Sequence, residues 1–67
     1  MRVRYDKLWR KMKDNKMKKK DLASAAGISL STITKMANEE FVSMEIIARM
    51  CKIFHCEVGD LIEFVEE

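Results

Sequence analysis

The stretch that decides the fold is Lys19–Met36, which reads KKDLASAAGISLSTITKM. Leucine and alanine in its first half are spaced as on one face of a helix, and Gly27 then stops that helix. Because glycine reaches positive φ at small cost, the chain can leave Gly27 at a steep angle. Ser29 is a good N-cap for a second helix that begins just after this glycine. The stretch therefore predicts two helices, 18–26 and 30–37, that meet across a short turn.

Helical spacing continues on both sides of this stretch. Upstream, apolar side chains at i, i+3, i+4 and i+7 predict a helix over 5–14. Downstream, a serine cap and a clear 3.6-residue stripe predict a helix over 43–54. A short last helix is expected over 58–62, and 62–65 fits either helix or strand. The larger apolar side chains that we assign to the core are Trp9, Met17, Met36, Phe41, Met44 and Met50.

The composition agrees with a small helical protein. Of the 67 residues, 48% are apolar and 36% charged, and there are two glycines and no proline. An all-β domain would need more turn residues, so an all-α bundle forming one domain over 1–67 is expected. No apolar run reaches the roughly 18 residues of a membrane span, and the basic start lacks the apolar core of a signal peptide. We therefore expect a cytoplasmic protein.

Charge is distributed unevenly along the chain. Residues 1–20 hold ten Lys and Arg against two acidic residues, a net +8, whereas residues 21–67 hold three against nine, a net −6. The asymmetry is typical of a protein with one end facing a polyanion, although a solvated surface would look the same. The helix pair decides between these interpretations, because it matches a helix-turn-helix, whose second helix inserts its first residues into the DNA major groove.

The sequence resembles the Cro/C1-type (XRE-like) helix-turn-helix family of phage-repressor-like DNA-binding domains. The residues that carry the resemblance are Leu22-Ala23, Gly27-Ile28-Ser29, Ser31-Thr32-Ile33 and Cys51–Leu61. The resemblance covers nearly the whole chain and implies a compact all-α five-helix bundle of the lambda repressor-like type. It also implies a small bacterial or mobile-element transcriptional regulator that binds double-stranded DNA sequence-specifically, commonly as a homodimer. We expect it to be a repressor.

By the same resemblance, the residues that read bases lie at the start of the third helix. They are Leu30, Ser31, Thr32, Thr34 and Lys35. Hydroxyls can donate to or accept from base edges, and a lysine can reach guanine. Leu30 departs from the family's frequent glutamine and could contact a thymine methyl, although a core position is slightly favoured. The candidates for phosphate contact are Arg10, Lys11, Lys18, Lys19 and Lys20, with Arg2 and Arg4 as an N-terminal arm.

Other functions are weaker predictions. An antitoxin-like or regulatory protein-interaction module of the same fold, with weak DNA binding, is the alternative, and its partner would bind the acidic, apolar segment 61–67. No arrangement of residues suggests an enzyme or a cofactor. Cys51, Cys56 and His55 lack the second ligand pair of a zinc site, so no metal is expected and the cysteines are interpreted as buried free thiols.

Overall fold

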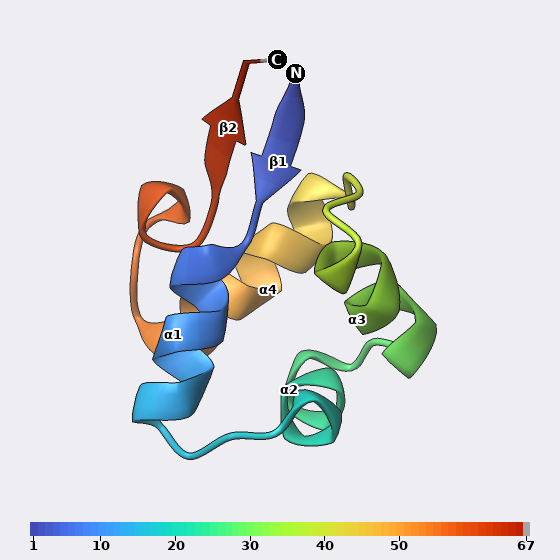
Figure 1. The fold of residues 1–67 in the computed structure, drawn as a ribbon. Coiled ribbons are helices and arrows are strands. Elements are labelled where there is room, and N and C mark those ends of the chain that lie inside the picture. The colour runs from blue at the N-terminus through green and yellow to red at the C-terminus, as the bar shows by residue number, and fades with distance from the viewer. Residues whose placement is uncertain (67) are drawn as a thin grey trace.

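The computed structural model describes residues 1–66, and within them the chain forms four α-helices, one turn of 3₁₀-helix and a two-stranded sheet (Figure 1). In chain order the elements are β1 (Arg2–Arg4), α1 (Asp6–Asp14), α2 (Lys19–Ala26), α3 (Leu30–Ala37), α4 (Met44–Phe54), η1 (Val58–Asp60) and β2 (Glu63–Val65). None of the helices in residues 1–66 has the length and hydrophobicity to span a membrane.

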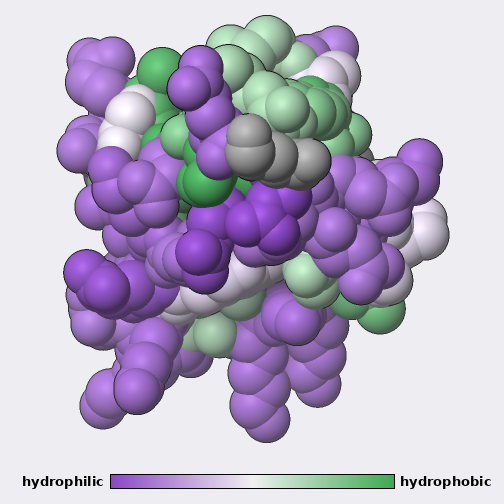
Figure 2. Space-filling view, turned by 45° about the horizontal axis from the view of Figure 1, so that its top comes forward, coloured by the Kyte–Doolittle hydropathy of each residue, from purple (hydrophilic) through white to green (hydrophobic). Residues whose placement is uncertain are grey.

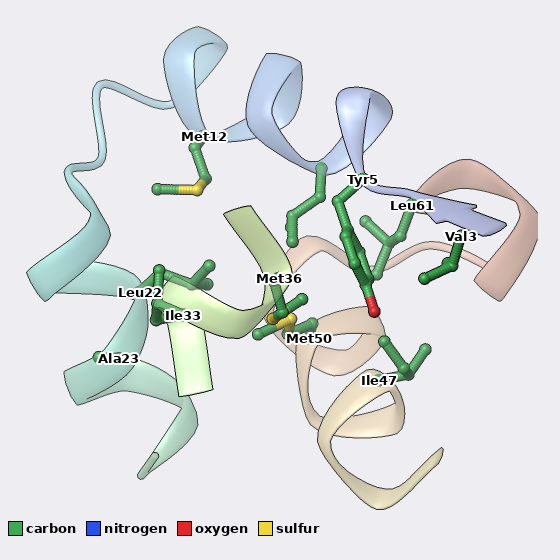
Figure 3. Close-up of a cluster of buried hydrophobic side chains, with 11 residues drawn as sticks. Val3, Tyr5, Met12, Leu22, Ala23, Ile33, Met36, Ile47, Met50 and Leu61 are labelled. Carbon is green, nitrogen blue, oxygen red and sulfur yellow. The ribbon is translucent and has the colours of Figure 1, made fainter. Parts of the chain in front are cut away.

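The core collects side chains from every helix and from both ends of the chain. Figure 3 shows these side chains converging on one space between α1, α2, α3 and α4. The buried cluster comprises Val3, Tyr5, Leu8, Met12, Leu22, Ala23, Ile33, Met36, Ile47, Met50 and Leu61. Because the same cluster fixes all four helices, the relative orientation of α2 and α3 depends on packing from the whole chain.

The helix starts are explained by local hydrogen bonds. The Ser29 Oγ accepts the Thr32 N–H at 3.3 Å, and the Ser43 Oγ accepts the Ile46 N–H at 3.3 Å, so both predicted N-caps are confirmed. Helix α2 has no such cap, and the Asp21 carboxylate instead accepts the N–H of the residue before the helix at 2.9 Å.

The prediction of five helices is wrong at the C-terminal end. The segment expected as the fifth helix makes only one 3₁₀ turn, closed by a bond from the Leu61 N–H to the Val58 carbonyl at 3.0 Å. Leu61 is fully buried, and the chain then continues as β2, antiparallel to β1, with Val3 opposite Phe64. Strand pairing with residues some 60 positions upstream therefore decides the conformation of 63–65, which helical periodicity could not reveal.

Two of the side chains assigned to the core lie on the surface. Met36 and Met50 are fully buried as predicted, and Trp9 and Met17 pack partly buried against the core. Met44 is 67% exposed because it is the first residue of α4 and precedes the turn that faces the core. The remaining exception is the phenylalanine of the loop before α4, Phe41, which is 62% exposed.

Candidate nucleic-acid interface

Helices α2 and α3 form a helix-turn-helix in which the turn is sharp. Gly27 ends α2 in the left-handed conformation, with φ of +68°, and the Ile28 N–H then bonds back to the Ala23 carbonyl at 3.0 Å. Ala23 and Ala26 are buried and small, which allows a close approach of the neighbouring helices. Ile33, which belongs to α3, is buried in the core. The predicted turn and its packing are therefore present.

An arginine of α4 holds the end of α2 at this turn. The Arg49 Nη1 donates to the Ala26 carbonyl at 3.2 Å and to the Gly27 carbonyl at 3.5 Å, while its Nη2 donates to the Glu45 carboxylate at 2.9 Å. A cation is favourable there because the last carbonyls of a helix carry partial negative charge. Sequence reasoning missed Arg49, and its one signal was an arginine next to the apolar stripe of its helix.

The first turns of α3 present the residues expected to read bases. Leu30, Ser31, Thr34 and Lys35 are exposed, and Thr32 is half-buried. Leu30 is 56% exposed, so the interpretation of it as a core residue is wrong, and its apolar side chain lies free on the surface.

Local hydrogen bonds order the hydroxyl groups on this surface. The Ser29 Oγ lies 2.8 Å from the Ser31 Oγ and 3.2 Å from the Thr32 Oγ1. The Thr34 hydroxyl donates to the Leu30 carbonyl at 3.1 Å, which leaves its oxygen lone pairs as acceptors. These bonds hold donors and acceptors in defined directions at the N-terminal end of α3.

The structure divides the predicted phosphate contacts into two groups. Lys18, Lys19 and Lys20 stand exposed at the start of α2, and the Lys19 ammonium lies 5.3 Å from the centre of the Trp9 ring. A groove beside them runs toward the end of α3, and its lining also includes Lys13, which the sequence reasoning did not select. This group lies at the start of the first helix of the helix-turn-helix.

The second group lies elsewhere on α1. Arg10 and Lys11 line a separate hollow together with Lys7, Asp14 and Asp60. Two carboxylates in the same hollow reduce its positive potential. The structure therefore does not bring Arg10 and Lys11 together with the lysines at the start of α2.

The N-terminal arm is a wrong prediction. Arg2 and Arg4 lie in β1, which is hydrogen-bonded to β2. Both guanidinium groups pair with the Glu39 carboxylate, at 3.4 and 3.3 Å, and Arg4 also pairs with Asp6 at 2.8 Å. These ion pairs tie the start of the chain to the loop between α3 and α4.

The cysteines are free thiols and lie half-buried. Burial, together with the neighbouring Cys56, raises the pKa of the Cys51 thiol, which disfavours its thiolate. Within residues 1–66 no group of three or more His, Cys, Asp or Glu side chains is placed to hold a metal ion.

Comparison with known proteins places this geometry in a family. The model of the Cro/C1-type helix-turn-helix DNA-binding domain matches residues 7–67, and the chain belongs to that family. Among solved structures, the chain is similar to the crystal structure of the transcriptional regulator VanUg, with 41% sequence identity and a TM-score of 0.91. That similarity covers 98% of this chain and 88% of the other. No curated protein matches the chain.

Proposed function

We propose that the protein is a sequence-specific double-stranded DNA-binding transcriptional regulator that inserts α3 into the major groove. One observation carries the proposal: α3 projects exposed polar residues from a helix pair that Gly27, Arg49 and the core hold in place. The B-DNA major groove is wide enough to admit an α-helix, and each base pair presents a distinct pattern of donors and acceptors there. The likeness to VanUg, a transcriptional regulator, supports the regulatory role.

Each exposed group of α3 has a role that fits its chemistry. Ser31, Thr32 and Thr34 exchange hydrogen bonds with base edges, and Lys35 donates to guanine O6 and N7. Leu30 contacts a thymine methyl, consistent with its exposed side chain. At the start of α2, Lys18, Lys19 and Lys20 bind phosphates, with Arg10 and Lys11 contacting the backbone further along the duplex.

The regulator acts in the cytoplasm. It acts there as a repressor, since a domain bound across a promoter excludes the polymerase. It does so as a homodimer. One α3 offers only about five base-reading side chains, and helix-turn-helix dimers read two half-sites about 34 Å apart. Two copies double both the base contacts and the phosphate contacts.

A second candidate function, a protein-interaction module, is supported by the exposed Phe41 and Phe64 rings. The acidic segment 61–67 is not a free tail over its described part, because Leu61 is buried and 63–65 forms β2. Glu67 lies outside the described residues. A partner protein would therefore have to contact the surface of the folded domain, in which case DNA binding would be weak and insensitive to sequence.

The test begins with duplexes that the wild-type protein enriches from a random-sequence pool. Fluorescence anisotropy then compares an enriched duplex with a scrambled one at 0.05 and 0.2 M salt. We expect Lys35→Ala to weaken binding to the enriched duplex by about 10- to 100-fold with little change on the scrambled duplex. Lys19→Ala should weaken binding to both and lower the salt dependence, since one fewer phosphate is neutralised.

The matched control is Lys52→Ala, which removes an exposed lysine from α4 at the same cost in net charge. It should leave both affinities close to wild type. Failure to enrich any sequence, or equal losses on both duplexes for Lys35→Ala and Lys52→Ala, contradicts base reading by α3 and favours the protein-interaction module.

A further inference from the structure

The groove between α1, the start of α2 and the end of α3 combines an apolar floor with two cations. It has a volume of about 520 Å³, within the range of small-molecule sites in proteins. The side chains that line it are Trp9, Met12, Lys13, Met17, Lys19 and Ala37. Within residues 1–66 its lining includes no carboxylate, unlike the hollow that holds Arg10 and Lys11. The groove therefore suits a ligand that is both apolar and negatively charged.

The turn after α1 builds the apolar floor. Lys16 adopts the left-handed conformation, with φ of +54°, and the Met17 N–H bonds back to the Met12 carbonyl at 2.8 Å. The Lys16 N–H bonds to the Lys13 carbonyl at 3.1 Å, which completes a Schellman motif. The two outer residues of this motif commonly form an apolar contact, and here Met12 and Met17 both line the groove. Because methionine side chains are flexible and polarisable, this floor can adapt to the shape of a ligand.

Trp9 gives the groove an aromatic wall in a fixed orientation. The centroid of its ring lies 6.3 Å from that of the Tyr5 ring, and the two planes are tilted by 56°. Tyr5 is itself buried, and its hydroxyl donates to the Glu40 carbonyl at 2.7 Å. Trp9 is only half-buried and lines the groove, so its side chain is accessible to a ligand. An aromatic ligand can pack against a ring that the core already holds in place.

Two lysines mark where the negative charge of the ligand would lie. Lys13 and Lys19 are exposed, and within residues 1–66 neither ammonium is paired with a carboxylate. The Lys19 ammonium lies 5.3 Å from the centre of the Trp9 ring, so an anion bound beside that ring is within its reach. The acidic group in the first turn of α2, Asp21, already accepts the Lys18 N–H. Figure 2 shows long hydrophilic side chains projecting at the lower end of the molecule, where α2 lies in Figure 1.

We propose that this groove is the binding site of a small amphipathic anion, whose apolar body packs on Trp9 and the methionines and whose carboxylate or similar group pairs with Lys13 and Lys19. A DNA phosphate would use only the lysines and leave the apolar floor uncovered, so the floor favours a ligand with an apolar body. Lys19 is also a proposed phosphate contact, and an anion bound to it removes one cation from the DNA interface. This consequence rests on the proposed function and makes the ligand a regulator of DNA affinity.

Trp9 is the only tryptophan of the chain, so its fluorescence reports on the groove directly. The probe is phenylbutyrate, an aromatic carboxylate, and it should change the Trp9 emission saturably. Lys13→Gln and Lys19→Gln should each raise its Kd about fivefold, the upper range for an exposed ion pair, and uncharged phenylbutanol should bind the wild type at least that much more weakly. Lys52→Gln is the matched control, because it removes an exposed lysine that does not line the groove.

Ala37→Leu tests the shape of the groove without changing its charge. Ala37 is exposed at the end of α3, so a leucine there should occupy the groove from its wall and weaken phenylbutyrate binding by about tenfold or more. Circular dichroism melting verifies that each variant folds. Unchanged affinity in Ala37→Leu and both lysine variants overturns the site, as does the lack of a saturable emission change at millimolar phenylbutyrate. If duplex DNA changes the Trp9 emission and phenylbutyrate does not, the groove belongs to the DNA backbone and the proposal is overturned.

A second titration tests the consequence for DNA. Saturating phenylbutyrate should weaken wild-type binding to the enriched and the scrambled duplex about as much as Lys19→Ala does, because one fewer phosphate is neutralised. Acetate at the same concentration, which has the charge but no apolar body, should have little effect. Unchanged duplex affinity of the saturated protein overturns the competition with DNA. The emission titration with phenylbutyrate contains no DNA, so it tests the site separately even where no duplex is enriched and the proposed function fails.

Discussion

The two glycines of the chain make opposite predictions for the same substitution. Gly27 has a φ of +68°, a conformation that costs a residue with a Cβ about 1–2 kcal/mol. A Cβ at Gly27 would lie 3.6 Å from the Arg49 Nη1, an ordinary contact, so no steric term is added. Alanine returns about 0.4–1 kcal/mol by restricting the unfolded chain. Gly27→Ala should therefore lower the free energy of unfolding by about 0.8 kcal/mol, the difference between the middles of these two ranges.

Gly59 is the internal control. It does not have a positive φ, and a Cβ there would meet no atom within 4 Å. Only the unfolded-chain effect remains, so Gly59→Ala should stabilise the protein by about 0.4–1 kcal/mol. Urea unfolding followed by circular dichroism measures both, and each kcal/mol corresponds to about 4–8 °C in Tm. If Gly27→Ala is as stable as Gly59→Ala at equal m-values, the left-handed cap is not what sets the turn.

Two further predictions concern side chains near the helix-turn-helix. Arg49→Met should lower the free energy of unfolding by about 1 kcal/mol and weaken binding to the enriched duplex, because the Ala26 and Gly27 carbonyls lose their donor. Lys52→Met, on the same helix, should change neither urea unfolding nor anisotropy, and identical behaviour of both variants would remove Arg49 from any positioning role. Because the pKa of Cys51 is raised, iodoacetamide at pH 8 should label it more slowly in the folded protein than in urea, as mass spectrometry of digests would show. Equal rates would contradict the burial of its thiol.

The backbone conformation of three turns could not be predicted from the sequence. The chain has only two glycines, yet it adopts the left-handed conformation at Lys16, Glu39 and His55 as well as at Gly27. Non-glycine residues rarely adopt this conformation, and of these three only His55 is of a type enriched in it. The expected helices end at residues 14, 37 and 54 as observed, but the left-handed residue that follows each end could not be predicted.

The candidate site residues also divide into those whose exposure helical periodicity predicts and those whose exposure it does not. Exposure of Ser31, Thr34 and Lys35 is a consequence of helical periodicity once Ile33 and Met36 face the core. Periodicity cannot tell whether Leu30, at the edge of that apolar face, is covered by a neighbour. The structure shows that it is not.

The sequence by itself determined the helix pair, because its decisive signals are local: a serine cap, a glycine stop and apolar spacing within about eight residues. Only the tertiary structure decided the pairing of β1 with β2, the Arg49 contact with the end of α2, and the meeting of Phe41 with Phe64. Each of these joins segments more than 20 residues apart, and no spacing within one helix or strand encodes which distant segment packing brings to it.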